Sequence, residues 1–390
     1  MDNHYELAIL GGGCAGLSLA MRLAESGLAA PKTLILEKNA QYLNDRTWCF
    51  WDEGNPELKA WVDHSWLNFE IKNGTNRFTK SCANNPYLML SAKTFYNQAI
   101  AKIALNEQSL TLLKNQEILE VTKIQHQLWR IITHNGAYTA NKIVDTRPNF
   151  NNQQASSILW QSFIGDEVET SADVFDRNAF VLMDFDASFS QGLGFVYVLP
   201  FSARHALLEY TVFSENALTA EKLREYGKPA FLKYLNGIDY KTLRTEFGQL
   251  PMGNQKIKKS SDPSYVYAGL FAGAARPSSG YAFQRIQQWA KQCSDALINH
   301  QLLVAPKKDA WTLAAMDEIF LSVLKSNPKK SIALLFNFFL HGKTTSVIRF
   351  LSDHARIVDY FSIISAMPSL LFLKQLPIYA YKRLLNRPND

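Results

Sequence analysis

The first residues with a recognisable chemistry are three glycines near the start of the chain. In the segment GGGCAG, Gly11, Gly13 and Gly16 have the spacing G-x-G-x-x-G. An apolar run, Tyr5–Leu10, precedes them and a helix-like segment follows, so we expect a strand, a tight turn and a helix. Gly11 allows the turn, Gly13 lets a pyrophosphate approach the free N–H groups of the helix start, and Gly16 lets helix and strand pack closely. The pattern predicts a dinucleotide-binding unit.

An acidic residue stands where such a unit binds a ribose. The second predicted strand, Thr33–Leu36, is followed by Glu37, 21 residues after Gly16. A carboxylate at this spacing accepts hydrogen bonds from the ribose hydroxyls of an adenosine. Because strand, loop, helix, strand and acid are all in register, a glycine turn without a ligand is the weaker interpretation.

Two further residues favour FAD over a nicotinamide cofactor. Arg46, within NDRTWCFW, can reach the cofactor from the loop after the second strand. A long region then leads to a predicted helix near Ala92–Ala104, and the later strand in YTANKIVDTRP ends at Asp145. This arrangement is typical of a two-part FAD-binding domain, and Arg46 and Asp145 are cofactor-binding candidates.

The stretch FAGAARPSSGYAFQRI is expected to return to the cofactor. A strand at Tyr265–Leu270 precedes it, and we expect a helix from about Tyr281, capped by Ser278 or Ser279. The N–H groups and dipole of a helix start favour an anionic, reduced flavin. Arg276 is interpreted either as a site residue or as an exposed loop charge. The cofactor-binding candidates of this stretch are Gly273, Ala274, Ser278, Gly280 and Tyr281.

Composition limits the function classes. Of 390 residues, 47% are hydrophobic and 19% charged, which suits a protein that handles an apolar ligand. Four cysteines without C-x-x-C spacing predict neither a disulfide framework nor a zinc site. Because no leader pattern precedes the first strand, we expect a cytoplasmic protein.

The last 70 residues combine ten Lys or Arg with three Asp. No basic run is interleaved with stacking aromatic residues, so no nucleic-acid partner is expected. The longest uncharged run, Tyr360–Leu373, has 14 residues and is shorter than the ~18–20 that a membrane-spanning helix needs. We expect helices from Asp309 onward that bind an anionic bilayer surface, which places the protein peripherally on the cytoplasmic side of a membrane. A helical cap on the two domains is the alternative. The helical period within Thr345–Met367 predicts one apolar face, formed by Val347, Leu351, Ala355, Val358 and Phe361.

Five segments in order across residues 5–290 carry a resemblance to one family. They are NDRTWCFW, LMDFD, FVYVLPFSARHALLEYT, EFGQLPMG and ARPSSGYAF. Together with the glycine loop, they resemble segments of the FAD-dependent lycopene cyclases of carotenoid synthesis. Arg276 replaces the histidine of the family's His-Pro-Ser-Thr-Gly-Tyr motif, and Tyr210 stands where plant enzymes carry a second glutamate.

The resemblance implies a reaction without net redox change. A proton adds to the terminal double bond of lycopene, and the neighbouring double bond closes a ring. Loss of another proton then gives the β-ionone rings of γ-carotene and β-carotene. The family requires reduced FAD, with NADH or NADPH as the reductant.

Such chemistry needs a carboxylic acid that is still protonated near neutral pH. The segments GFVYVLPF and HALLEYTV predict a hairpin whose second strand places Leu207, Glu209, Thr211 and Phe213 on one face. An apolar environment raises the pKa of a carboxyl, so Glu209 is the candidate acid. The pattern alone also fits a surface glutamate paired with Arg204 or Lys222.

The strand Phe180–Ala187 contains the second acid/base or structural candidate, Asp184. Strict alternation places Asp184 on the same face as Phe180, Leu182 and Asp186.

The predicted fold class is α/β: a two-domain FAD-binding fold, with a Rossmann-like dinucleotide domain, an antiparallel-sheet substrate domain and a C-terminal helical segment. The assigned ranges are 1–50, 92–150 and 262–300 for the FAD-binding domain, 51–91 and 151–261 for the substrate-binding sheet domain, and 301–390 for the helical membrane-associated region. Two alternatives share this fold. One is an FAD-dependent monooxygenase or isoprenoid reductase, and the other is a non-catalytic carrier of prenyl groups.

Overall fold

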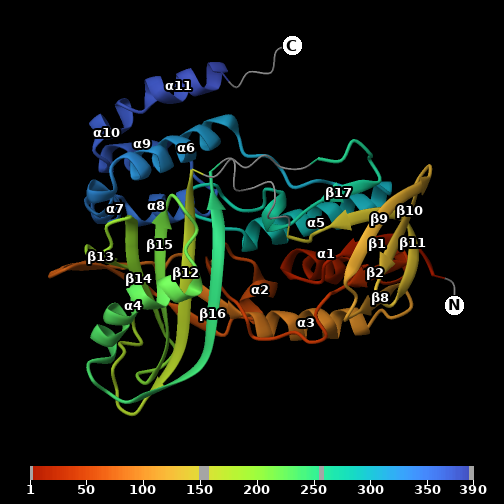
Figure 1. Ribbon diagram of the computed structural model, residues 1–390, viewed down its shortest axis with the longest axis horizontal. Coiled ribbons are helices and arrows are strands. Elements are labelled where there is room, and N and C mark those ends of the chain that lie inside the picture. Colours follow the sequence, from red (N-terminus) through yellow and green to blue (C-terminus); the bar gives the residue numbers. More distant parts are fainter. Residues whose placement is uncertain (1–2, 149–157, 254–258, 386–390) are drawn as a thin grey trace.

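The computed structural model describes residues 3–148, 158–253 and 259–385, so the ends of the assigned ranges at 149–157 and 386–390 lie outside it. It contains a mainly parallel sheet with its helices, a large mainly antiparallel sheet, and a group of C-terminal helices (Figure 1). This mixed α/β architecture is the predicted fold class.

The parallel sheet forms the dinucleotide part of the molecule. Its strands are, in spatial order, β8 (Leu110–Leu113), β2 (Thr33–Leu36), β1 (His4–Leu10), β11 (Gly136–Asp145), β10 (Leu128–Thr133) and β9 (Ile118–Gln125), with β17 (Tyr265–Tyr267) also paired to β11. One face is covered by three helices, α1 (Cys14–Ala24), α3 (Ala92–Ala104) and α5 (Phe283–His300). Side chains of β10 and β17 join the core on the other face. Because both faces are covered, Leu7–Leu10 of β1 and all of β2 are buried, and only Thr33 among these residues is polar.

The large sheet forms the second part. Its order is β16 (Tyr240–Met252), β12 (Leu159–Thr170), β15 (His205–Ser214), β14 (Gly192–Pro200), β13 (Phe180–Asp186), β5 (Asn68–Asn73) and β6 (Asn76–Ser81). Neighbours are antiparallel except for β13 and β5. Helix α4 (Ala220–Leu235) packs on one face, and the opposite face turns toward the C-terminal helices.

A small sheet connects the two parts. It consists of β3 (Thr47–Trp51), β7 (Tyr87–Ser91) and β4 (His64–Trp66), and the short helix α2 (Pro56–Ala60) follows β3. The Gln284 side chain of α5 donates to the Trp51 carbonyl at 3.0 Å. The Trp66 indole donates to the Pro200 carbonyl of β14 at 3.1 Å. The range 51–91 therefore contributes strands to both the small and the large sheet. Among the described residues, the 3₁₀ turns η1 (Gly27–Ala29) and η3 (Leu270–Ala272) also precede the C-terminal helices.

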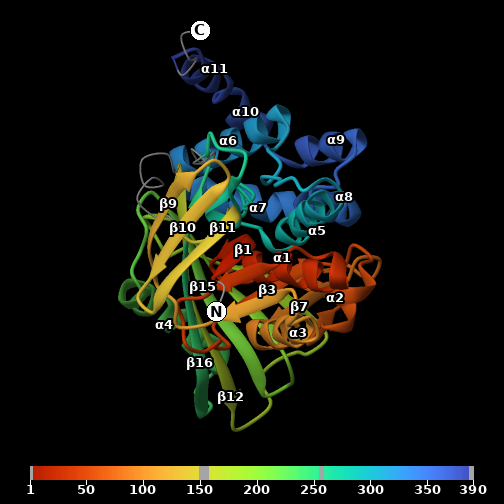
Figure 2. The same ribbon diagram turned by 90° about the vertical axis from the view of Figure 1, so that its right-hand side faces the viewer.

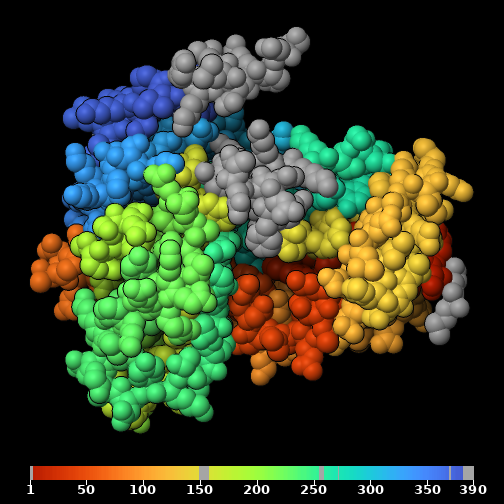
Figure 3. All heavy atoms as spheres, in the orientation of Figure 1, coloured from red at the N-terminus to blue at the C-terminus, as the bar shows by residue number. Residues whose placement is uncertain are grey.

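The C-terminal helices lie on one end of the large sheet (Figures 1, 2 and 3). They are α6 (Trp311–Ser326), α7 (Pro328–His341), α8 (Thr344–Leu351), α9 (Ile357–Ala366), α10 (Ser369–Leu373) and α11 (Leu376–Leu385). Within the described ranges, no single helix has the length and hydropathy to cross a bilayer, although α9 and the helical segment 370–380, bent by 100° at their junction, meet both criteria as a pair.

The predicted single apolar face within Thr345–Met367 is wrong. The chain breaks between α8 and α9, where Asp353 has φ 62°, a left-handed conformation that ends a helix. After this break Val358 and Phe361 point outward, with exposed fractions of 67% and 70%.

Arg276 fastens the C-terminal helices to the loop before α5. Its side chain is 1% exposed and lies 3.2 Å from Asp317 of α6 through both Nε and Nη2. The guanidinium also stacks on the Phe350 ring, 4.2 Å from the ring centre. Beside it, Arg285 of α5 pairs with Asp309 and Asp353. Arg276 is therefore not an exposed loop charge but a buried cation that joins two parts of the fold.

Candidate active site

A continuous cavity of about 1340 Å³ connects the glycine loop with the C-terminal helices. Its lining includes Gly13 and Glu37 of the dinucleotide part, Glu209 of the large sheet, and apolar side chains such as Phe338 and Ile364 of the C-terminal helices. The lining thus changes from polar backbone and carboxylate groups to hydrocarbon within one space.

The start of α1 forms a cradle at the polar end. Gly13 occupies the N-cap position of this helix, and in the described structure no side chain caps the N–H groups of the first turn. The first turn also contains no acidic residue. A Cβ built on Gly13 would meet no described atom within 4 Å, so the space before the helix is open. A Cβ on Gly16 would lie 2.0 Å from the Gly11 carbonyl oxygen, which explains why close helix–strand packing requires glycine there. Uncapped N–H groups facing open space fit a pyrophosphate.

Glu37 closes the other side of this cradle. Its buried carboxyl accepts from the backbone N–H groups of Gly12 and Asn39, both at 2.8 Å. These two hydrogen bonds fix the Glu37 carboxyl in the cavity lining, a position that fits hydrogen bonding to the hydroxyls of a ribose. The nearby Tyr42 hydroxyl is buried and lacks a partner within the described residues, as expected where a polar ligand belongs.

Arg46 and Asp145 differ in their position. Arg46 lines the cavity, and its guanidinium donates to the Asp45 carbonyl at 2.6 Å. Asp145 is buried outside the cavity lining. Its carboxylate accepts hydrogen bonds from the Arg147 guanidinium at 2.8–2.9 Å and from the Tyr265 hydroxyl at 2.6 Å. The neighbouring Arg147 is the residue that reaches the cavity. Asp145 therefore lies outside the described cavity lining and supports Arg147, and its predicted contact with a cofactor stays a prediction.

The start of α5 faces the middle of the cavity, but it differs in detail from the expectation. The helix begins at Phe283 rather than near Tyr281, because Gly280 has φ 69° and the Tyr281 carbonyl is engaged by the Arg276 N–H at 2.9 Å. Neither Ser278 nor Ser279 caps it. Among the described residues the cap position, Ala282, receives no side-chain bond. These N–H groups are thus free to face an anionic ring.

The candidate residues of this loop separate into two groups. Ser278, Gly280 and Tyr281 line the cavity, and the buried Tyr281 hydroxyl has no partner in the described part of the chain. Gly273, which ends η3 with φ 90°, and Ala274, which is 4% exposed, do not belong to the described lining. Gly273 and Ala274 therefore belong to the turn and are not part of the described cavity lining.

Glu209 lies on the face predicted for it. Leu207, Thr211 and Phe213 line the same cavity, and the Thr211 hydroxyl donates to the Glu209 carboxyl at 2.7 Å. Burial raises the pKa of Glu209 to about 8, the nearby Glu246 carboxylate adds to the rise, and the Thr211 bond opposes it. Arg204 pairs with Asp173 instead. Glu209 is thus a carboxylic acid that keeps its proton at pH 7.

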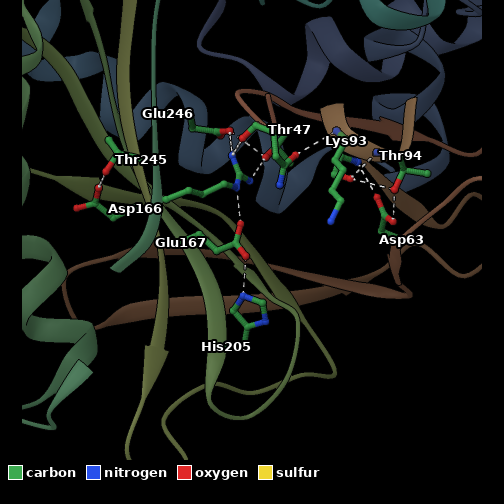
Figure 4. Close-up of polar contacts among 12 residues, drawn as sticks. Thr47, Asp63, Lys93, Thr94, Asp166, Glu167, His205, Thr245 and Glu246 are labelled. Atoms are coloured by element: carbon green, nitrogen blue, oxygen red, sulfur yellow. Dashed lines mark hydrogen bonds and ion pairs between the residues drawn. The ribbon is translucent and has the colours of Figure 1, made fainter. Parts of the chain in front are cut away.

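Glu246 is a site residue that the sequence interpretation missed. It is 4% exposed and accepts from Arg244 at 2.7 Å and from the Thr47 hydroxyl at 3.0 Å (Figure 4). The segment EFGQLPMG contains it, and alternation along this strand could have placed Arg244 and Glu246 on one face. The strand pairing could not be inferred from the sequence: Gly165 of β12 pairs with Glu246 on one side and with Glu209 on the other.

The prediction that Asp184 shares the face of Phe180 and Leu182 is wrong. The β13 ladder shifts register between Val181 and Asp184, so strict alternation fails there. Asp184 points to the α4 side, where the Tyr234 hydroxyl donates to it at 2.8 Å. Because the cavity is on the opposite face, Asp184 has a structural role in the packing of α4.

Tyr210 also lies outside the cavity. Its hydroxyl donates to Asp186 at 2.7 Å on the α4 side of the sheet, and its ring fills the space left by Gly227. The position at which plant relatives carry a second glutamate therefore points away from Glu209 in this chain.

The fold and the cradle define the class of protein. Solved structures with the same fold are a geranylgeranyl bacteriochlorophyll reductase-like protein from Thermoplasma acidophilum, a flavin-dependent brominase, and a halogenase in complex with FAD. Their TM-scores are 0.61, 0.63 and 0.57, with 12%, 11% and 11% identity, over 96%, 97% and 98% of this chain and 99%, 100% and 93% of theirs. The chain has the two-domain FAD-binding fold of flavoprotein enzymes, and its cradle fits FAD.

The particular family follows from the sequence comparison. The lycopene cyclase protein family matches residues 6–376, so the chain belongs to this family. A lycopene beta-cyclase of Pantoea ananas is 24% identical over 303 residues, 72% of each chain. A lycopene beta-cyclase of Pseudescherichia vulneris is 26% identical over 292 residues, 71% of this chain and 70% of its own. A lycopene beta cyclase of Capsicum annuum is 24% identical over 346 residues, 79% of this chain but 65% of the pepper protein. The chain is therefore a carotenoid cyclase or a related FAD enzyme.

Proposed function

We propose that the protein is a lycopene β-cyclase that works with reduced FAD. The observation that carries this proposal is that Glu209, a desolvated carboxyl with its pKa raised to about 8, lines the same cavity as the FAD cradle and the apolar side chains of the C-terminal helices. A proton donor in hydrocarbon surroundings next to a flavin is what a proton-initiated polyene cyclisation needs.

The chain's own residues supply the proton step. Glu209 gives its proton to the terminal double bond of the polyene, and the neighbouring double bond closes onto the cationic carbon. A proton then leaves the ring, so that the number of protons and electrons is unchanged. The aromatic rings of Phe195 and Tyr197 line this part of the cavity and face the cation, and such contacts contribute roughly 0.5–2 kcal/mol each. Reduced FAD, which the glycine loop and Glu37 would hold, would supply a negative charge that stabilises the cation, and NADH or NADPH would keep it reduced.

Expression in bacteria that accumulate lycopene tests the proposal. The wild-type chain should convert red lycopene to β-carotene, and Glu209→Gln should retain bound FAD while losing cyclisation. Unchanged lycopene in the presence of folded, FAD-loaded wild-type protein would refute the proposal.

The structural likeness to a geranylgeranyl bacteriochlorophyll reductase-like protein favours one second candidate, an isoprenoid reductase. Net consumption of one NAD(P)H for each product molecule distinguishes it, because cyclisation consumes none.

We propose further that the apolar end of the cavity docks on a bilayer. A C-terminal apolar patch, 45–76% exposed, is formed by Ile357, Val358, Phe361, Ile364, Leu370, Leu373, Leu376 and Ile378. Three of its members, Ile364, Leu373 and Leu376, also line the cavity. The exposed Arg356 directly precedes α9, and the exposed Lys374 directly follows α10. Basic residues next to the helices that carry an exposed apolar patch fit a peripheral contact with an anionic leaflet, on the cytoplasmic side, through which lycopene would enter.

Sedimentation with vesicles of phosphatidylglycerol and phosphatidylcholine tests this contact. Val358→Ser combined with Phe361→Ser should reduce binding to the anionic vesicles. The control Leu105→Ser, at an 89% exposed leucine after α3, should not reduce it. Equal binding of all variants would exclude the patch as the contact.

A further inference from the structure

Glu209 and Glu246 face each other across a strand that carries no side chain between them. Gly165 of β12 pairs with Glu209 of β15 on one side and with Glu246 of β16 on the other. A Cβ on Gly165 would lie 3.2 Å from Glu246 Cγ and 3.5 Å from Glu209 Cβ. Glycine at this position therefore lets two carboxyls that are two strands apart share one side of the cavity.

The two carboxyls have different partners. Glu246 accepts from the Arg244 guanidinium at 2.7 Å and from the Thr47 hydroxyl at 3.0 Å, and Arg244 in turn pairs with Glu167 (Figure 4). Glu209 receives only the neutral Thr211 hydroxyl among the hydrogen bonds and ion pairs of the described residues. Charge-assisted bonds stabilise a carboxylate more than a neutral hydroxyl does, so the negative charge belongs on Glu246.

The other titratable groups that face the pair do not change this assignment. Tyr87 of β7 is buried, and Cys49 of β3 and Tyr197 of β14 are half-buried. Desolvation holds the pKa of each above its ordinary value, so all three are neutral. Arg46 lies on the side of Glu246, whose charged form it favours. Burial raises the pKa of Glu246 too, but its arginine partners oppose the rise, so Glu246 ionises before Glu209.

We propose that Glu246 is a positioning residue: it remains a carboxylate, held by Arg244, and keeps the proton on Glu209 through the gap left by Gly165. This inference rests on the proposed function, because it assigns Glu209 as the acid. Two like charges at close range in a buried site are unfavourable, so the pair carries one proton. When Glu209 gives that proton to the polyene, two carboxylates face one carbocation. The proton that leaves the ring returns to Glu209 and restores the initial state.

The test is the pH profile of cyclisation by Glu246→Gln. Without the neighbouring charge, the alkaline midpoint should move down by at least about one pH unit, and activity at pH 8 should fall about fivefold or more, while activity at low pH persists. Glu246→Asp, which keeps the negative charge, should have an alkaline midpoint close to that of the wild-type protein. The matched control is Asp166→Asn, which removes a buried carboxyl next to Gly165 but on the opposite face, where it binds Arg224 and Thr245. An unchanged midpoint in Glu246→Gln would overturn the proposal, and loss of activity at every pH would also overturn it by making Glu246 a direct participant.

Two additional measurements keep the inference testable. Infrared titration of the FAD-loaded protein, with Glu209→Gln as the reference, reads the protonation of Glu209 without turnover. A midpoint that moves down in Glu246→Gln supports the proposal even if lycopene is not the substrate, and an unmoved one refutes it. If Glu246→Gln does not fold, Gly165→Ala keeps both carboxyls but pushes against Glu246, and it should move the midpoint in the same direction.

Discussion

The raised pKa of Glu209 makes a quantitative prediction for the pH dependence of turnover. With a pKa of about 8, about nine-tenths of the molecules carry the Glu209 proton at pH 7. A carboxyl with its ordinary value of 4.5 would be protonated in about 0.3% of molecules, roughly 300-fold fewer. Burial next to Glu246 therefore supplies the acid in the state that the reaction requires.

The assay is initial-rate cyclisation of lycopene in vesicles with chemically reduced FAD, from pH 6 to pH 10. Because the protonated form is active, the rate should be level below about pH 8 and then fall about tenfold for each further pH unit. Chemical reduction removes any pH dependence of the NAD(P)H step. A decline that starts near pH 5, or a rate that rises through pH 8, would refute the assignment of Glu209 as the acid.

Three further predictions concern stability and cofactor binding. Between pH 4.5 and about 8 the folded protein holds a Glu209 proton that the unfolded chain has lost, so stability falls as pH rises through this window. Glu209→Gln should therefore have the higher melting temperature at pH 8, and a lower one would contradict the burial argument. Gly16→Ala places a Cβ 2.0 Å from the Gly11 carbonyl, and fluorescence titration should show loss of FAD affinity. Arg276→Met leaves Asp317 buried without its partner, which should cost about 3–5 kcal/mol in denaturant unfolding. The double variant with Asp317→Asn should recover part of that loss, and no recovery would argue against the ion pair.

Local pattern was sufficient for the dinucleotide end of the fold. The glycine spacing, the strand before it and Glu37 are determined by residues close in sequence, and the structure places them at one cavity wall. The face of Glu209 was also predictable, because the hairpin that contains it keeps a regular two-residue period.

Features that depend on register or on distant chain segments were not predictable from pattern. The shift in β13 reverses the side on which Asp184 lies, and strict alternation cannot detect such a shift. The partner of Arg276, Asp317, is 41 residues away, so its burial could not be inferred from the loop. The pairing of Glu246 with Glu209 requires knowledge that β12 separates their strands.

The lining of the cavity includes solvent-exposed residues of opposite chemistry. At the glycine end its lining includes the exposed polar residues Lys38, Asn39 and Arg46, and at the other end the exposed Ile364 and Leu373. On the proposed function, we expect water-soluble reactants to approach past the polar residues and the polyene past the apolar ones, without competition for one opening. Steady-state kinetics should then show non-competitive behaviour between the two kinds of reactant.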